Sequence, residues 1–192
     1  MLEQLLQWDA DWFFIINNEW NNGFFNAVLP FLRNKLIWIP LYLFIFVFIL
    51  INHTNKAVFI LLFAGLTIFA ADFTSSKIVK PQVERPRPCN NEEIKSSVVL
   101  LVHCGQGYSF TSSHATNHFA LAIFLIITLQ YKLSWLLLFW AGCISFSQVY
   151  VGVHYPLDIL GGALLGALLG YILGKLCLRW TNSHAQQLKK ME

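Results

Sequence analysis

Long runs of apolar residues dominate this sequence and constrain its fold more than any other feature. About 20 helical residues cross the hydrocarbon core of a bilayer. Five runs have roughly that length, at 35–52, 57–79, 113–131, 134–153 and 157–178. We therefore expect an all-α, polytopic membrane bundle of about five transmembrane helices. The third run is the weakest candidate, because its first turn contains His114, Asn117 and His118.

The composition agrees with a membrane chain. Only 12% of the residues are charged, against about 25% in a typical soluble domain. The net charge of +3 is small and no basic block occurs, so no nucleic-acid partner is expected. The first 16 residues carry three acids and lack a basic region, which argues against a cleavable signal peptide.

Residues 1–34 differ from the rest of the chain. On a helical wheel, one half of the first 16 residues is apolar, which predicts an amphipathic helix in the membrane interface. Asp9 falls within that apolar half. It either breaks the helix and caps a second one, or meets a polar partner. We divide the chain into this interfacial segment, a transmembrane bundle at 35–180, and a polar tail at 181–192.

Two loops hold most of the polar residues. The first, about 80–112, joins the second and third runs, and the second, about 152–156, joins the fourth and fifth. Five antiparallel spans bring both loops to one membrane face. If the cations of the first loop bind ligand, the remaining Lys and Arg favour an extracytoplasmic position for this face. Cys89 and Cys104 lie in the first loop, where they either form a disulfide or remain two thiols.

Four glycines of the last run are spaced four residues apart, at 162, 166, 170 and 174. Such a face allows two helices to approach closely. It serves either packing inside the bundle or a dimer seam. An oligomer is therefore possible but not required.

The first polar cluster, KPQVERPRP at 80–88, contains Lys80 and Arg87. Cations at the end of a membrane helix suit an anionic headgroup, and the planar Arg fork suits phosphate. The alternative is a basic collar at the interface.

The second cluster, YSFTSSHATNHF at 108–119, places Ser112 and Ser113 before an apolar helix. A helix N-terminus attracts anions. His114 in the first turn could protonate a leaving oxygen. The alternative is an ordinary polar cap, and His118 is interpreted as structural.

The third cluster, SQVYVGVHYPLD at 147–158, places Asp158 one turn after His154. A carboxylate on one imidazole nitrogen fixes the tautomer and frees the other nitrogen to attack. The alternative is a capped helix start with a buried hydrogen bond. No metal-binding spacing, Walker loop or dinucleotide fingerprint occurs, so we expect no cofactor.

Together the three clusters resemble the type 2 phosphatidic acid phosphatase superfamily of membrane lipid phosphatases. That family has Lys, six residues, Arg-Pro; then Pro-Ser-Gly-His; then Ser-Arg, five residues, His, three residues, Asp. The matching positions here are Lys80, Arg87-Pro88, Thr111-Ser112-Ser113-His114, Ser147-Gln148, His154 and Asp158.

The resemblance implies a metal-independent hydrolase of lipid phosphates or pyrophosphates in a bacterial inner membrane. His154 would form a phosphohistidine, Asp158 would orient it, and His114 would protonate the leaving oxygen. Phosphate would be held by Lys80, Arg87, Ser112, Ser113 and Gln148.

Gln148 stands where the family has Arg, and loss of a charged clamp can cost roughly 10²- to 10³-fold in rate. Arg85 could supply the charge instead. The alternative function is a weakly active or inactive lipid-phosphate binder or transporter.

Overall fold

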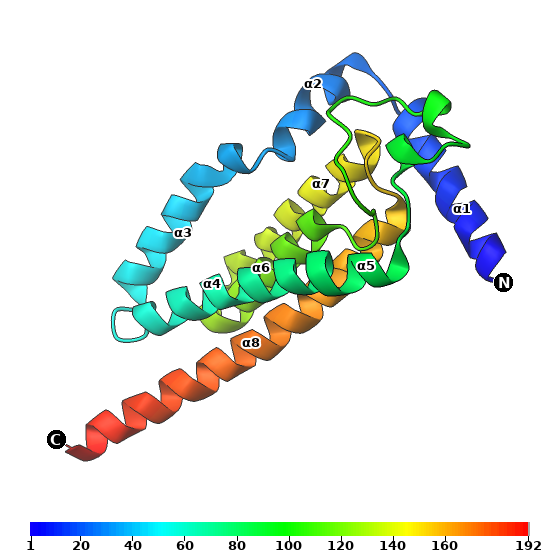
Figure 1. The fold of residues 1–192 in the computed structure, drawn as a ribbon. Coiled ribbons are helices and arrows are strands. Elements are labelled where there is room, and N and C mark those ends of the chain that lie inside the picture. Colours follow the sequence, from blue (N-terminus) through cyan, green and yellow to red (C-terminus); the bar gives the residue numbers. More distant parts are fainter. Residues whose placement is uncertain (192) are drawn as a thin grey trace.

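The computed structural model describes the backbone of residues 1–191 and the side chains of residues 1–183. Its described part consists of helices joined by loops and contains no strand, as expected (Figure 1). The α-helices are α1 (Leu2–Phe14), α2 (Gly23–Leu32), α3 (Ile39–Asn52), α4 (Ala57–Phe73), α5 (Lys80–Val83), α6 (Ser113–Leu129), α7 (Leu136–Tyr150) and α8 (Pro156–Met191). A π-helix at Ile15–Glu19 extends α1, and another at Thr74–Val79 joins α4 to α5. Short 3-10 turns occur at Lys35–Trp38, Pro88–Asn90, Lys95–Ser97 and Lys132–Trp135.

Within the described residues, four helical stretches have the length and apolar character of a full span. They are Lys35–Asn52, Ala57–Val83, Lys132–Tyr150 and Pro156–Ser183. The fifth expected helix is α6, which is present but has only 17 residues, many of them buried. It begins at Ser113, the predicted start, and ends two residues before the predicted end, where Gln130 adopts the left-handed conformation. The bundle thus has four full-length spans and one shorter central helix.

Helix α6 lies at the centre of the bundle against α8, α4 and α7. The glycines of α8 make the closest approach possible. A Cβ atom on Gly166 would lie 2.2 Å from the carbonyl oxygen of Thr116, and one on Gly170 would lie 2.3 Å from that of Ala120. The glycine face is thus used for packing inside the bundle, and not as a dimer seam.

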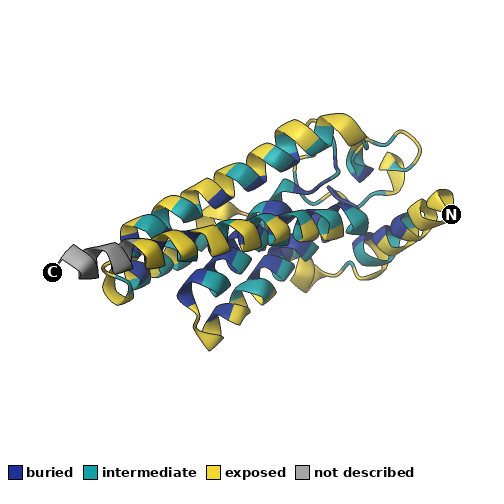
Figure 2. Ribbon diagram, turned by 90° about the horizontal axis from the view of Figure 1, so that it is seen from below, coloured by how far each residue is buried: buried dark blue, intermediate teal, exposed yellow. Residues whose placement is uncertain are grey.

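The outer faces of the long helices carry large exposed apolar side chains. Phe44 on α3, Phe69 on α4, Phe139 on α7 and Leu164 on α8 are each at least 64% exposed. Figure 2 shows buried residues on the inner sides of the helices and exposed ones on the outer sides. An apolar belt of this extent is what lipid contact requires, because in water it would drive association.

The N-terminal segment has the expected amphipathic character. Leu2, Leu5, Leu6, Trp8 and Trp12 of α1 are exposed. The helix continues through Asp9 without a break. Of the two interpretations of Asp9, the polar partner is correct, because its carboxylate contacts Arg85 and the Leu157 amide.

Helix α8 begins at Pro156, close to the predicted start, but continues to Met191 rather than ending near 178. The predicted tail at 181–192 therefore begins inside this helix. Its side chains from 184 onward lie outside the described residues.

Candidate active site

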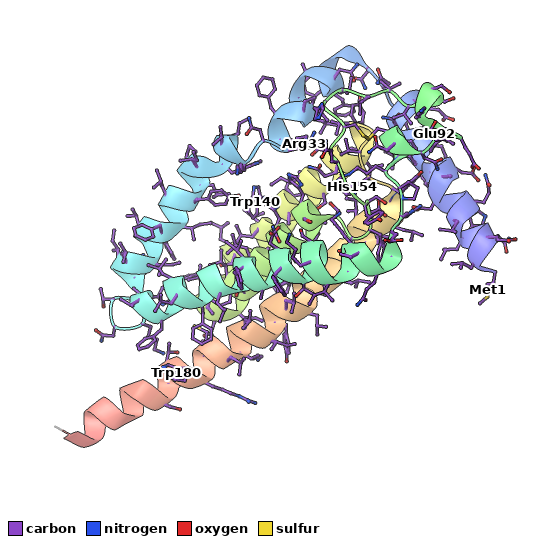
Figure 3. The ribbon with its side chains drawn as sticks, viewed as in Figure 1. Met1, Arg33, Glu92, Trp140, His154 and Trp180 are labelled. Atoms are coloured by element: carbon purple, nitrogen blue, oxygen red, sulfur yellow. A yellow bond between two sulfur atoms is a disulfide. The ribbon has the colours of Figure 1, made fainter. Side chains whose placement is uncertain are left out.

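The two polar loops meet at one end of the bundle, as predicted. Lys80 at the start of α5 donates from Nζ to the carbonyl oxygens of Tyr108 (2.7 Å) and Ser109 (3.2 Å). Arg87 donates from Nη1 to the carbonyl oxygen of Val153 in the other loop, at 3.3 Å. In Figure 1 the 84–112 segment folds over the end of the bundle that also carries α1, opposite the C-terminus. Figure 3 places His154 at this same end.

His154 and Asp158 form the predicted pair. Nδ1 of His154 lies 3.3 Å from Oδ2 of Asp158, and the same oxygen accepts the Tyr155 amide at 2.8 Å. Since α8 begins at Pro156, its first turn brings Asp158 back toward His154. Both residues are buried. A carboxylate acceptor on Nδ1 holds the proton there and leaves the lone pair on Nε2.

Nε2 of His154 faces a cation. Nη1 of Arg87 lies 3.2 Å away and donates toward it. Burial, with help from the charges of Arg87 and Lys80, lowers the pKa of His154 to about 4 against the opposing effect of Asp158. The imidazole is therefore neutral near pH 7, which is the state a nucleophile needs.

Gly152 shapes the loop that carries His154. Its φ is +86°, and a Cβ there would lie 2.7 Å from Cγ1 of Val98 and 3.0 Å from the Val99 carbonyl oxygen. Asn17 of the N-terminal segment fastens the same place, because its amide donates to the carbonyl oxygens of Val99 (2.8 Å) and Tyr150 (2.7 Å). The loop is thus held from two sides.

The start of α6 has one free hydroxyl and one engaged hydroxyl. Ser112 is the N-cap residue, but its Oγ caps no amide and is buried without a hydrogen-bond partner among the described residues. Ser113 Oγ instead bonds Ser75 (3.1 Å) and Ser76 (3.0 Å). Ser75 also bonds Thr111. The two departures from the family turn, Thr111 and Ser113, are therefore tied to the π-helix before α5.

The two histidines of α6 differ in their contacts. His114 is close enough to His154 for the charges of the two rings to interact. His118 contacts the Tyr42 hydroxyl through Nε2 (3.4 Å), points Nδ1 at the His114 carbonyl oxygen (2.7 Å) and packs edge-on against Trp140. These contacts fit the structural interpretation of His118.

Gln148 does not reach the other predicted phosphate ligands through its side chain. Its Nε2 donates to the Ile144 carbonyl oxygen at 3.4 Å, and Oε1 is buried without a partner among the described residues. Its backbone carbonyl accepts the His154 amide at 3.2 Å. Gln148 thus fixes the backbone of His154, whatever its side chain does with a ligand.

Arg85 does not replace the missing arginine. Its guanidinium binds Asp158 Oδ1 through Nη1 (3.0 Å) and Asp9 Oδ2 through Nη2 (2.5 Å), and it lies 3.9 Å above the ring of Tyr155. Two carboxylates therefore occupy the donors that a phosphate clamp would need.

Arg33, which none of the three sequence motifs includes, is a further cation near the site. It follows α2 and has no ion pair or hydrogen bond through its guanidinium among the described residues. Its charge acts on both Arg87 and His114. Figure 3 shows Arg33 and His154 at the same end of the molecule. No local signal marks it, because it is separated by more than 40 residues from the first motif.

Of the two alternatives for Cys89 and Cys104, the structure has the disulfide, with Cα atoms 6.0 Å apart. Cys89 lies two residues after Arg87, and a Cβ on Gly105, next to Cys104, would lie 3.5 Å from the Arg87 guanidinium carbon. The bridge therefore supports the position of Arg87. The other two cysteines, Cys143 and Cys177, are free, and Cys177 is buried.

An apolar cavity of about 510 Å³ opens beside the site, between α3, α4 and α6. Ser113, His114, Asn117 and Asp72 line its polar end, and Asn117 donates to Asp72 at 3.1 Å. The rest of its wall is mostly aliphatic and aromatic. Within residues 1–183, no group of three His, Cys, Asp or Glu side chains is arranged as metal ligands.

Residues 56–182 match the family model of the PAP2 superfamily. A lipid A 4'-phosphatase of Bacteroides thetaiotaomicron is 34% identical over 170 residues, which cover 86% of this chain and 75% of the relative. An undecaprenyl-diphosphatase of Sulfolobus acidocaldarius is 29% identical, covering 85% and 76%.

Among solved structures, a PAP2-type phosphatidylglycerolphosphate phosphatase of Bacillus subtilis aligns with a TM-score of 0.63 and 21% identity. The alignment covers 93% of this chain and 87% of that one. At this identity the likeness concerns the fold.

Proposed function

Because the chain belongs to the PAP2 superfamily of membrane phosphatases, we propose that it hydrolyses a lipid phosphate or diphosphate through a phosphohistidine. One observation carries the proposal. His154 is held by Asp158 on Nδ1 and directs Nε2 at the Arg87 guanidinium, where a phosphoryl group would bind. A fixed tautomer with its lone pair directed at an anion site is the arrangement of a nucleophile.

In the first step, Nε2 of His154 attacks phosphorus and forms the N–P bond while the bond from phosphorus to the lipid oxygen breaks. His114 gives a proton to the departing oxygen, so a monophosphate substrate leaves as the neutral lipid alcohol and a diphosphate substrate leaves as the singly protonated lipid phosphate. In the second step, His114 takes a proton from water, and the hydroxide attacks phosphorus. The N–P bond breaks, which returns neutral His154 and releases inorganic phosphate.

Fixed cations and donors would stabilise the charge on the phosphoryl oxygens. Lys80 and Arg87 supply positive charge. The buried Ser112 hydroxyl and Nε of Arg87 are hydrogen-bond donors that have no partner among the described residues. Backbone amides at the start of α6 add further donors. Arg33 adds a further charge, which acts on Arg87 and His114. The side chain of Ser113 is engaged elsewhere, so only its backbone serves.

The cavity between α3, α4 and α6 fits the lipid part of such a substrate. It begins at His114 and continues along Leu121 and Leu125 toward the interior of the bundle. An acyl or isoprenoid chain lying there would keep the phosphate at the membrane surface. This arrangement explains why the reacting groups sit at the helix ends.

The lipid is best identified by a panel. The relatives named above act on lipid A and on an undecaprenyl diphosphate, and their shared feature is the phosphate rather than the lipid. Purified protein should be assayed for phosphate release from lipid A 4'-phosphate, undecaprenyl diphosphate, phosphatidylglycerol phosphate and phosphatidic acid, with His154→Ala as the blank. Equal release by the parent and the blank on every lipid would refute the proposal.

Gln148 favours a second candidate, a lipid-phosphate binder with little or no turnover. The same panel distinguishes the two. Saturable binding of a lipid phosphate by the parent, without phosphate release above the His154→Ala blank, supports the binder. Release above the blank supports the phosphatase.

We further propose that the site faces the extracytoplasmic side of a bacterial inner membrane. Two observations support this orientation. The disulfide at the site persists in oxidising compartments. At the opposite end, Lys56 lies beside the C-terminal part of α8, where its Nζ donates to Asn182. Lys175 and Arg179 belong to the same part of α8, and cations at this end are favourable if it faces the cytoplasm.

A further inference from the structure

A buried carboxylate from α1 enters the site from outside the family match, which begins at residue 56. The side chain of Asp9 is fully buried. Its Oδ2 pairs with Nη2 of Arg85 at 2.5 Å, and its Oδ1 accepts the Leu157 amide at 2.7 Å, in the first turn of α8. A carboxylate at a helix N-terminus stabilises the helix, but a solvent-exposed carboxylate would provide that stabilisation as well. Burial indicates a more specific use.

Arg85 links Asp9 to the reacting pair. Its Nη1 donates to Asp158 Oδ1 at 3.0 Å, while Asp158 Oδ2 lies 3.3 Å from His154 Nδ1. The Arg85 backbone is fixed as well, because its carbonyl accepts the Ser109 amide at 2.8 Å. Asp9, Arg85, Asp158 and His154 therefore form one continuous chain of charge-assisted contacts.

We propose that Asp9 and Arg85 are positioning residues: Arg85 holds Asp158 against His154, and Asp9 holds Arg85 and neutralises its charge. This inference rests on the function proposed above, in which neutral His154 attacks phosphorus. It assigns a role in the reaction to the N-terminal helix.

The charges around His154 explain why neutralisation matters. Lys80 of α5, Arg87 of the segment after α5 and His114 of α6 face it, and the first two of these are cations. Asp158 of α8 is the opposing anion. Arg85 would cancel that anion if Asp9 did not cancel Arg85. Arg85 would also turn both of its donor edges to Asp158 and compete with His154 for the carboxylate.

Neutralising Asp9 and neutralising Arg85 therefore change the net charge near His154 in opposite directions. Asp9→Asn removes one negative charge from the cluster and so makes protonation of His154 harder. Arg85→Gln removes one positive charge and makes protonation easier. The double variant Asp9→Asn/Arg85→Gln restores the net charge. A residue that only stabilises the fold would lower activity without producing opposite shifts.

The experiment measures kcat/KM against pH for these three variants in detergent, on whichever lipid phosphate the parent hydrolyses. We expect the acid limb to move down by about one pH unit in Asp9→Asn and up by a similar amount in Arg85→Gln. The double variant should return to within a few tenths of a unit of the parent. Asp11→Asn is the matched control, since Asp11 lies on the same helix, is exposed and bonds Gln7.

A second readout does not depend on turnover. The imidazole ¹⁵N resonances of histidine-labelled protein report the titration of His154, which is assigned by its loss in His154→Ala. Opposite shifts of this titration in Asp9→Asn and Arg85→Gln support the inference even where a variant has lost activity.

The outcomes separate the two proposals. If His154→Ala retains the activity of the parent, the phosphohistidine mechanism is wrong. If His154→Ala is inactive but the titration of His154 in Asp9→Asn coincides with that in Asp11→Asn, the positioning role alone is wrong. A lower melting temperature of Asp9→Asn with an unchanged titration also overturns the positioning role, because Asp9 then only stabilises the fold.

Discussion

Nη1 of Arg87 lies 3.2 Å from Nε2 of His154, although the two residues are 67 positions apart in the chain. The same guanidinium nitrogen donates to the Val153 carbonyl oxygen at 3.3 Å. Arg87 is therefore fixed to the loop that carries His154 and presents its remaining donors beside the lone pair of the imidazole. A phosphoryl group bound to Arg87 would lie in the path of attack.

This relationship predicts that Arg87→Lys lowers kcat/KM by roughly 10²- to 10³-fold, the usual loss for one preorganised donor. An ammonium group lacks the planar fork and cannot hold both Val153 and phosphate in one geometry. Phosphate release from the best lipid of the panel measures the effect. Lys95→Met is the control, because exposed Lys95 pairs only with Glu92 among the described residues. Equal kcat/KM in Arg87→Lys and the parent would contradict the assignment.

Gln148→Arg should raise turnover. Arg85 is occupied by Asp9 and Asp158, so no cation fills the role of the family arginine from that position. The gain should appear in kcat rather than KM, since the added charge acts where charge develops. His154→Ala/Gln148→Arg serves as the blank. A kcat no higher than that of the parent would show that the added cation does not reach the phosphoryl group.

Breaking the disulfide should weaken both the fold and the site. Closing a loop of this size is worth about 3 kcal/mol in the chain-entropy model, so Cys89→Ser/Cys104→Ser should unfold at lower temperature. KM should rise too, because the bridge lies beside Arg87. Cys143→Ser, at a free cysteine, is the control. Both cysteines reacting with a thiol reagent in protein purified without reductant would rule out the bridge.

The pH dependence should show an unusually low acid limb. Because burial lowers the pKa of His154 to about 4, the imidazole stays neutral and able to attack until the pH approaches that value. Protonation below it removes the lone pair, so kcat/KM should fall there. A solvated imidazole would give a midpoint near 6.5. Measuring the pH profile with two substrates whose phosphates ionise at different pH values separates the ionisation of the enzyme from that of the substrate. An acid midpoint near 6.5 with both substrates would contradict the prediction.

The α6–α8 contact should not tolerate a methyl group. Gly166→Ala would place Cβ 2.2 Å from the Thr116 carbonyl oxygen, and overpacking of this kind costs about 1–3 kcal/mol or more. Gly142→Ala is the matched control, since nothing lies within 4 Å of its added Cβ. Thermal unfolding in detergent measures both. Equal melting temperatures would mean that the two helices are not packed this closely.

Local patterns in the sequence were sufficient for several features. The apolar runs predicted membrane helices, because length and hydropathy alone decide whether a helix can cross lipid. The pairing of His154 with Asp158 was predictable as well, since residues four apart at a helix start face each other. The disulfide was one of two alternatives for two cysteines in one polar loop. In each case the partners are close in sequence or share a simple constraint.

Other features depended on the packing of distant segments. Asp9 and Arg85 are 76 residues apart, and no periodicity relates α1 to the segment after α5. The sequence left Asp9 with two interpretations and offered Arg85 only as a possible replacement for the family arginine. The surroundings of Arg33 and of the Ser113 hydroxyl likewise depend on segments distant in the sequence. Buried charges require partners, but which distant residue supplies the partner is decided only when the helices pack and exclude water from both.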